Sequence, residues 1–197
     1  MEPIILASGS PRRQETLKMM GIPFQVIIPE IDETNTDNII AKELPEDLAI
    51  KKIKCVIKSL PATQEVPWIL SADTLIVYNG KTYGKPANIE QAAEFLDTFS
   101  GKTHQVITAM ALYNGKVHDY TTRTTITDVT FATLSKDEID WYLSTGEWHN
   151  AAGGYRIQGF GSYFIKKIHG TNSAVVGLPL FELYDMLKEQ GYSLISD

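Results

Sequence analysis

The stretch Leu6-Ala7-Ser8-Gly9-Ser10-Pro11-Arg12-Arg13 organises the fold that we expect for this chain. The apolar residues 4–6 before it predict a short buried strand, and Ser8-Gly9-Ser10 predicts a tight turn. Pro11 then opens a helix, because a proline at the first helical position lacks only an N–H that would have no partner there. Ser10 is expected to cap this helix, and Gly21 to end it.

Two arginines in the first turn of this helix require an anion nearby. A helix N-terminus carries partial positive charge, so each cation placed there costs about 0.3–1 kcal/mol. A small-residue turn, a helix N-terminus and two guanidinium groups together predict a phosphate site, with Ser8, Ser10, Arg12 and Arg13 as its residues. The alternative is that both arginines pair with surface carboxylates such as Glu15.

Composition limits the class of protein. The chain has 197 residues, 43% of them hydrophobic, and a net charge of −6, which together predict one domain or two lobes that share a sheet. An acidic chain does not attract nucleic acid or an acidic membrane surface, so the basic site suggests a small anionic ligand. Neither a signal peptide nor an apolar run of about 20 residues is found, which predicts a cytoplasmic protein.

Asp73 lies in the middle of residues 68–78, which read as one long apolar strand. Such a strand is buried on both faces, and a buried carboxylate without a partner costs several kcal/mol. Asp73 is therefore expected to have a metal ion, a cation or a ligand beside it, unless the strand bends there toward solvent. Catalysis, metal binding and a structural polar network remain open at this point.

Two lysines and an acidic pair are further candidates. Lys52 falls at the edge of the apolar stripe of a helix over residues 45–60, where a lysine either follows apolar surface or reaches into a cleft. Lys85 stands between Gly84 and Pro86, which restrict its direction. Asp32 and Glu33 follow a second strand at residues 24–28, in a loop beside the phosphate site; they read as a solvated turn or as ligands of a divalent cation.

The remaining chain alternates helices with hairpins, which predicts a mixed sheet. His104, at the start of a strand, is expected to be a structural hydrogen-bonding residue. A segment with four glycines within residues 153–161 reads as a mobile connector or as backbone that wraps a ligand. The other elements expected are a hairpin turn at 79–80, a helix at 88–99, a strand at 103–113, a turn at 114–115, a strand at about 116–133, a helix opened by a capping box at 135–138, a strand at 162–168, a turn at 170–173, and a final helix with Phe181, Leu183, Tyr184 and Leu187 on its apolar stripe.

Six short motifs in the same order resemble the Maf family of nucleoside triphosphate pyrophosphatases, over nearly the whole chain. They are residues 6–13, Ala72-Asp73-Thr74, Gly84-Lys85-Pro86, Thr103-His104-Gln105-Val106, Gly153-Gly154-Tyr155 with Ile157-Gln158-Gly159, and Val175-Val176-Gly177-Leu178-Pro179. The resemblance implies an elongated α/β fold of two lobes around a mixed sheet, similar to inosine triphosphate pyrophosphatases. It also implies a cleft between the lobes, a single Maf-like domain over residues 1–197, and frequent dimerisation.

The resemblance implies hydrolysis of a nucleoside triphosphate to the monophosphate and pyrophosphate, with Mg²⁺ or Mn²⁺. Asp73 matches the family's proton acceptor, and Glu33, Lys52 and Lys85 match other polar residues of its site; Glu33 or Asp73 would hold the metal. Arg12, Thr74 and Gln158 match the positions associated with substrate choice, and these residue types resemble the branch that acts on dTTP and UTP. Ala174 departs from the asparagine that many members carry, which weakens the inferences on the dimer and the branch.

The resemblance leaves two alternatives open. One is the same reaction with another base specificity, such as 7-methyl-GTP. The other is a nucleotide-binding regulator without turnover. Removal of modified nucleotides is a further reading of the same reaction.

Overall fold

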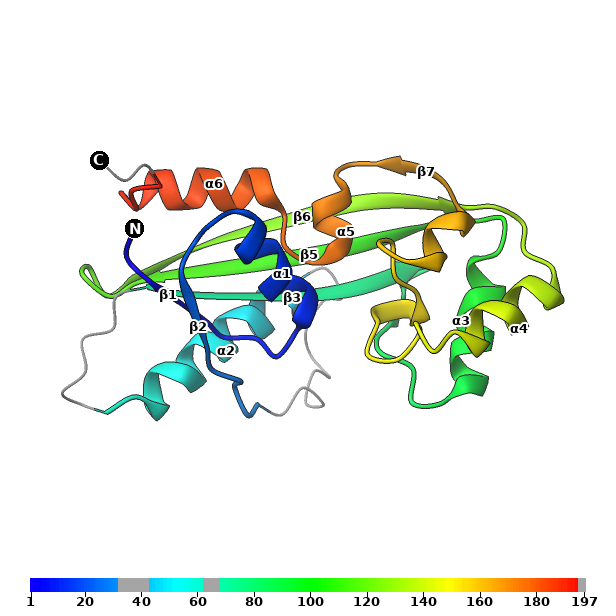
Figure 1. The fold of residues 1–197 in the computed structure, drawn as a ribbon, viewed down its shortest axis with the longest axis horizontal. Coiled ribbons are helices and arrows are strands. Elements are labelled where there is room, and N and C mark those ends of the chain that lie inside the picture. Colours follow the sequence, from blue (N-terminus) through cyan, green and yellow to red (C-terminus); the bar gives the residue numbers. More distant parts are fainter. Residues whose placement is uncertain (32–42, 62–67, 195–197) are drawn as a thin grey trace. The chain divides into compact units, whose positions relative to one another are not determined.

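The computed structural model describes residues 1–31, 43–61 and 68–194 (Figure 1). Glu33 and Asp32 therefore lie outside the described residues. The elements are β1 (Ile4–Leu6), α1 (Pro11–Met19), β2 (Phe24–Val26), α2 (Leu44–Ser59), β3 (Trp68–Tyr78), β4 (Lys81–Tyr83), α3 (Ile89–Phe99), β5 (Thr103–Asn114), β6 (Asp119–Phe131), α4 (Lys136–Ser144), the 3₁₀ helices η1 (Ala152–Gly154) and η2 (Phe160–Phe164), β7 (Ile165–His169), α5 (Asn172–Val176) and α6 (Leu180–Glu189).

Within the described residues, seven strands form one mixed sheet. Its order is β2-β1-β3-β5-β6-β7, with β4 paired to β3 outside this path. β1 runs parallel to both β2 and β3, whereas β4 is antiparallel to β3 and β7 is antiparallel to β6. The prediction of a mixed sheet with flanking helices is confirmed.

The chain divides into two compact units, each with its own core. The first unit comprises Met1–Asp73, Thr108–Thr125 and Gly177–Asp197, and the second comprises Thr74–Ile107 and Ile126–Val176. β3, β5 and β6 each contribute residues to both units.

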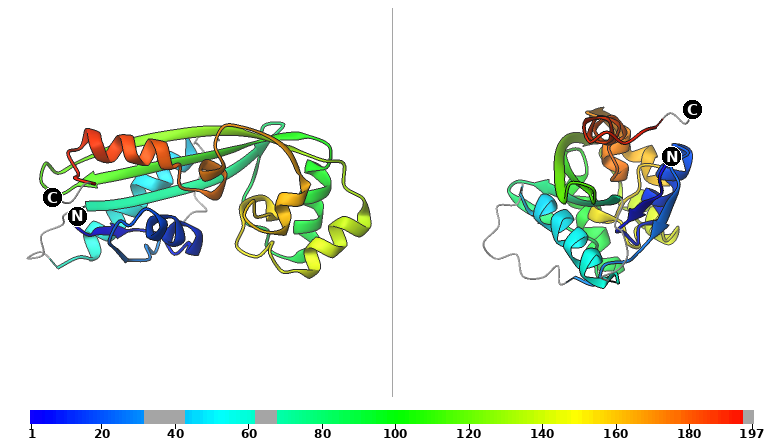
Figure 2. Two further views of the ribbon diagram at one scale, coloured as in Figure 1. Left: turned by 45° about the horizontal axis from the view of Figure 1, so that its top comes forward. Right: turned by 90° about the vertical axis from the view of Figure 1, so that its left-hand side faces the viewer.

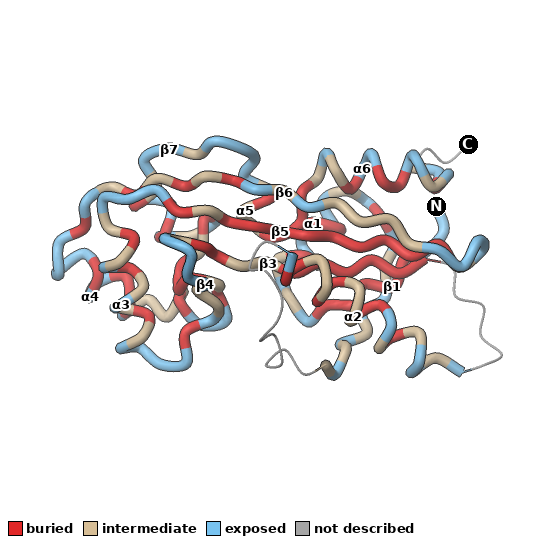
Figure 3. The backbone as a smooth tube through the Cα atoms, turned by 180° about the vertical axis from the view of Figure 1, so that it is seen from behind, coloured by how far each residue is buried: buried red, intermediate tan, exposed pale blue. Residues whose placement is uncertain are grey.

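The sheet of the first unit buries both of its faces. In β1, Ile4 and Leu6 pack in one cluster with residues of α1 and α6, whereas Ile5 packs in another with residues of α2. This alternation follows from the two-residue period of a strand. α2 and α6 accordingly lie on opposite faces of the strands in this unit (Figure 2), and β1 and β3 run as buried backbone between them (Figure 3).

The core of the second unit is aromatic. Phe99, Phe131 and Tyr155 all lie within ring-contact distance of His104, whose own side chain is buried. The His104 Nε2 atom lies 2.8 Å from the Tyr155 hydroxyl. Burial lowers the pKa of His104 from 6.5 to about 4, because the charged imidazolium would lose its hydration. The expectation that His104 is structural is therefore confirmed.

Several of the described elements up to α4 lie where they were predicted, although β2 ends at Val26 and not at residue 28. β3, β4, α3 and the capping box before α4 lie where they were expected. Asn88 caps α3 by accepting a hydrogen bond from the Gln91 N–H, and the Ser135 hydroxyl accepts one from the Glu138 N–H. The turn after β5 is longer than expected, since β6 begins at Asp119.

The segment from residue 160 to residue 176 differs from the prediction. The expected strand at 162–168 begins at Ile165, because Phe160–Phe164 forms a 3₁₀ helix. The expected turn at 170–173 gives way to the short helix α5. The predicted stripe of α6 is also wrong at two positions: Leu183 and Leu187 are buried, but Phe181 and Tyr184 are exposed, and Met186 takes their place in the core.

No helix among the described residues combines the length and the apolar character needed to cross a membrane.

Candidate active site

The turn after β1 and the first turn of α1 form a polar cluster in the first unit. Ser8 Oγ accepts a hydrogen bond from the Ser10 N–H at 3.2 Å and another from Arg13 Nη1 at 3.0 Å. Arg13 Nε donates to the carbonyl oxygen of Gly177 at 2.9 Å, and its side chain is only 9% exposed. The guanidinium is thus held in one orientation by a hydroxyl and a carbonyl.

Among the described residues, the N-cap residue of α1 makes no capping hydrogen bond through its side chain. Ser10 occupies the N-cap position with an extended backbone, but its hydroxyl makes no capping hydrogen bond, which corrects the prediction that it caps the helix. The first turn contains no acidic residue, and half-buried Arg12 follows Pro11 there. N–H groups at such a helix end suit an anion.

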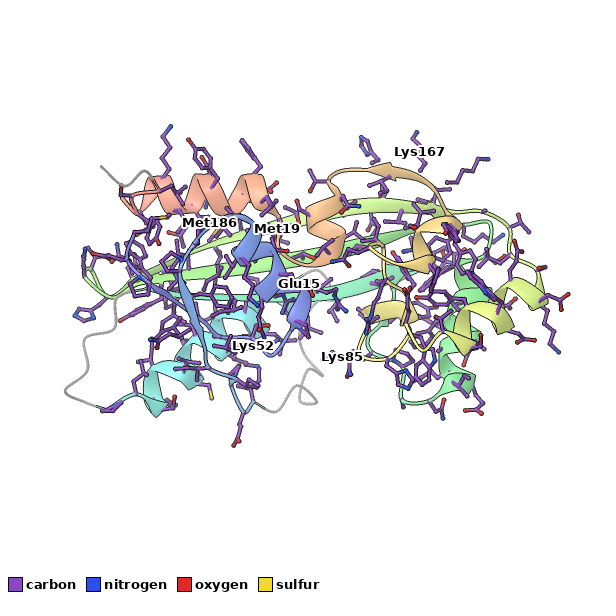
Figure 4. The ribbon with its side chains drawn as sticks, in the orientation of Figure 1. Glu15, Met19, Lys52, Lys85, Lys167 and Met186 are labelled. Atoms are coloured by element: carbon purple, nitrogen blue, oxygen red, sulfur yellow. The ribbon has the colours of Figure 1, made fainter. Side chains whose placement is uncertain are left out.

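Lys52 and Asp73 form a buried ion pair on the other face of the sheet. The Lys52 Nζ atom lies 2.5 Å from Asp73 Oδ1, and each residue is 8% exposed. Lys52 projects from α2, on the helix face that also buries Ala49 and Ile53 (Figure 4). Asp73 points toward α2 because every second residue of a strand lies on the same face, and Ile69, Ser71 and Asp73 share one face of β3. Ile69 packs with residues of α2, and the Ser71 hydroxyl donates to the Ala49 carbonyl. Of the partners expected for Asp73, which were a metal ion, a cation or a ligand, the structure shows a cation.

The cluster of Ser8 and Arg13 and the Lys52–Asp73 pair both lie near the level at which β1 ends. In the parallel pairing of β1 with β3, Leu6 stands opposite Leu70, and the Ala7 N–H still donates to the Leu70 carbonyl. Ser8 therefore follows the last paired residue of β1, and Asp73 lies beyond that level on β3. In sheets of this kind, ligands bind at the carboxyl ends of parallel strands.

Three further candidates belong to the second unit. Thr74 follows Asp73 in β3 and is half-buried, whereas Lys85 and Gln158 are exposed. Lys85 lies on the segment after β4, and the carbonyl of the preceding Gly84 accepts a hydrogen bond from the Gly153 N–H at 2.8 Å. This contact joins the Lys85 segment to the glycine-rich segment that carries Gln158.

The described residues contain no group of three or more His, Cys, Asp or Glu side chains that could hold a metal ion. Asp73 is the one predicted metal ligand among them. A single carboxylate fits Mg²⁺, which is commonly bound by one or two carboxylates together with substrate phosphates and water. Asp73 therefore fits this chemistry as one protein ligand of such an ion.

One contact of this site was missed in the sequence. The Gly177 carbonyl orients Arg13, and Gly177 has a positive φ of 106° that aims the backbone there. The motif Val175–Pro179 singled out this segment, but a backbone carbonyl has no signature of its own in a sequence. The role of Ser71 in tying β3 to α2 was likewise not identified.

Comparisons with known proteins agree with the resemblance read from the motifs. The sequence model of the family described as "Maf-like protein" matches residues 3–190. A "dTTP/UTP pyrophosphatase" of Desulforamulus reducens is 42% identical over 195 residues, covering 99% of this chain and 100% of its own. A protein of the same name from Symbiobacterium thermophilum is 41% identical over 100% of this chain and 98% of its own. The Ham1 protein structure from Staphylococcus aureus aligns with 66% of this chain and 72% of its own, at 14% identity and a TM-score of 0.48. With a family match over nearly its full length and relatives above 40% identity, this chain belongs to the Maf family.

Proposed function

We propose that this chain hydrolyses dTTP and UTP to the monophosphate and pyrophosphate. Relatives of that name match it at 41–42% identity over nearly the full length of both chains, which supports the choice of substrate. The observation that carries the chemistry is the buried Asp73 carboxylate, held by Lys52 at the carboxyl end of β1.

The residues after β1 are proposed to bind the phosphate groups. A triphosphate carries about four negative charges, which require neutralisation by cations and N–H donors. Arg13 is already fixed by Ser8 and Gly177, so its guanidinium loses little conformational freedom when an anion arrives. Ser8, Ser10, Arg12 and the N–H groups at the N-terminus of α1 complete the proposed binding surface.

Asp73 is proposed to take a proton from the attacking water. The water oxygen bonds to the α-phosphorus, the bond from that phosphorus to the bridging oxygen of pyrophosphate breaks, and the water proton goes to the Asp73 carboxylate. Lys52 orients this carboxylate through one oxygen, Oδ1. Lys85 is proposed to neutralise charge on the phosphates, and Glu33 or Asp73 to hold the metal. A bound Mg²⁺ or Mn²⁺ ion would supply charge neutralisation and polarisation of the phosphate.

Thr74 and Gln158 are proposed to read the base, with Arg12 contributing to substrate choice. Thymine and uracil share one carbonyl and N–H edge, whereas cytosine presents a reversed donor and acceptor there. A site built on such hydrogen bonds rejects the wrong base strongly, because buried polar groups are then left without partners.

A panel of nucleoside triphosphates tests this proposal. With Mg²⁺ present, dTTP and UTP should give the monophosphate and pyrophosphate much faster than CTP, GTP or 7-methyl-GTP. Comparable rates on GTP and dTTP would contradict the roles of Thr74 and Gln158. Tight binding of dTTP without any product would favour a nucleotide-binding regulator. The predicted homodimer, cytoplasmic location and removal of modified nucleotides stay predictions.

A further inference from the structure

Glu147 holds the backbone that follows Gln158. Glu147 lies after the C-terminus of α4, in the second unit. Its Oε1 accepts a hydrogen bond from the Phe160 N–H at 3.1 Å, and its Oε2 accepts one from the Gly161 N–H at 3.4 Å. One carboxylate thus binds two consecutive amides at the start of η2, where a negative group is favoured by the orientation of the N–H groups.

Gly159 leaves the space for this carboxylate. A Cβ atom added at Gly159 would lie 2.0 Å from Glu147 Oε1 and 2.5 Å from Oε2, which is far inside van der Waals contact. The φ of Gly159 is −118°, so the glycine is not required by a left-handed backbone. An added methyl group would therefore displace the Glu147 carboxylate, which is the end of a flexible side chain, and not the backbone.

The other side of Gln158 is anchored as well. The Arg156 N–H donates to the Tyr142 hydroxyl at 3.1 Å, and Arg156 Nη2 donates to the His149 carbonyl at 2.8 Å. Ile157 is buried next to it. Gln158 is therefore an exposed residue on a short turn whose backbone is fixed before it by Arg156 and after it by Glu147.

We propose that Glu147 is a positioning residue for base selectivity, acting through Gln158. The inference rests on the proposed function, in which the Gln158 amide recognises the pyrimidine edge. An amide distinguishes uracil from cytosine by the positions of its donor and its acceptor, and these positions depend on where the main chain places the side chain. The two backbone hydrogen bonds of Glu147 hold the main chain from which this amide projects.

Glu147→Ala tests the proposal through the ratio of kcat/KM for UTP to kcat/KM for CTP. This ratio should fall by about tenfold or more, because small displacements of a recognition group have effects of that size. The saturated rate on UTP should stay close to that of the wild type while KM rises, since Asp73 and Lys52 are untouched. Asp140→Ala removes an exposed carboxylate from α4 and is the matched control, with an unchanged ratio.

Gly159→Ala reaches the same contact from the other side and serves if the Glu147→Ala protein folds poorly. The added methyl group displaces the carboxylate, so this variant should lose selectivity as Glu147→Ala does. The double variant should lose no more than either single variant, because both remove one interaction. Glu147→Gln, which keeps one acceptor oxygen, should lie between wild type and Glu147→Ala.

A wild-type ratio in Glu147→Ala or in Gly159→Ala overturns the proposal. An equal fall of the UTP to CTP ratio in Asp140→Ala and in Glu147→Ala also overturns it, because removal of any negative charge near α4 would then have the same effect. A wild-type protein that hydrolyses neither dTTP nor UTP overturns the proposed function, and this inference with it. Activity on UTP with an unaltered ratio in the variants leaves the proposed function standing and removes only the role of Glu147.

Discussion

At the residue scale, the proposed chemistry depends on a buried carboxylate. Asp73 lies within a largely apolar strand, and Lys52 compensates its burial from the neighbouring helix. A buried ion pair of this kind is weak evidence for stability, because desolvation offsets most of the attraction. The presence of this ion pair beside β3 is better explained by the catalytic role that we propose for the carboxylate.

Replacement of this carboxylate should separate chemistry from folding. Asp73→Asn retains an oxygen that can accept from Lys52 but loses the proton-accepting charge, so turnover of dTTP should fall by about 100-fold or more. Initial rates on the folded protein measure the loss, and circular dichroism should show the wild-type fold, although the melting temperature should fall because the buried Lys52 charge then faces a neutral amide. Wild-type rates in this variant would rule out Asp73 as the proton acceptor.

Loss of the lysine should instead destabilise the fold. Lys52→Met leaves the Asp73 carboxylate buried without its cation, which costs about 3–5 kcal/mol in comparable pairs. Urea denaturation measures the free energy of unfolding. Lys51→Met is the matched control on the same helix: its partner Asp47 and Lys51 itself are exposed, so a change below about 1 kcal/mol is expected. Equal effects of the two substitutions would contradict the account of the buried pair.

At the scale of elements, local signals in the sequence were sufficient where a cap, a hairpin turn or a periodic stripe was present. They predicted β3, α3 and α4 closely. They failed across residues 160–176, since glycines and aromatic residues there fold by contacts with distant segments, such as the carboxylate of Glu147. The stripe of α6 was misassigned at Phe181 and Tyr184 because aromatic character alone does not show which face meets the sheet.

The candidate site, like the fold, was predicted only in part from the sequence. The sequence indicated separately that Lys52 lies at the edge of a buried face and that Asp73 needs a partner. Their pairing could not be predicted, because it depends on which face of β3 meets α2. The contact of Arg13 with the Gly177 carbonyl joins residues 164 positions apart, and no local pattern encodes it.

The capping box of α4 provides a test at this scale. Ser135→Ala removes the acceptor of the Glu138 N–H and should lower the free energy of unfolding by about 1 kcal/mol. A domain of this size should then melt about 2–4 °C lower. Lys136→Ala, at the next position, should have a smaller effect. An unchanged melting temperature for Ser135→Ala would mean that the end of α4 contributes nothing to global stability.

At the scale of the whole molecule, stability should depend on pH through the aromatic core of the second unit. The pKa of an ordinary histidine is 6.5, and burial lowers that of His104 to about 4 in the folded protein because it disfavours the cation. Below pH 6.5 the unfolded chain binds a proton that the folded chain does not, so stability falls as the pH drops from 6.5 toward 4. The total loss from this group is about 3 kcal/mol.

Urea denaturation at pH 7.5, 6.5, 5.5 and 5.0 measures this dependence, above the range in which most carboxylates titrate. His104→Gln removes the titrating group and should flatten the profile over that interval, whatever its effect on stability at pH 7.5. A profile that is equally steep in the variant would assign the pH dependence to other groups.

The reaction itself is tested most directly by the products formed from dTTP in the presence of Mg²⁺, separated by ion-exchange chromatography. Cleavage between the α and β phosphates predicts dTMP and pyrophosphate in equal amounts. The appearance of dTDP and inorganic phosphate, or of no product at all, would contradict the account.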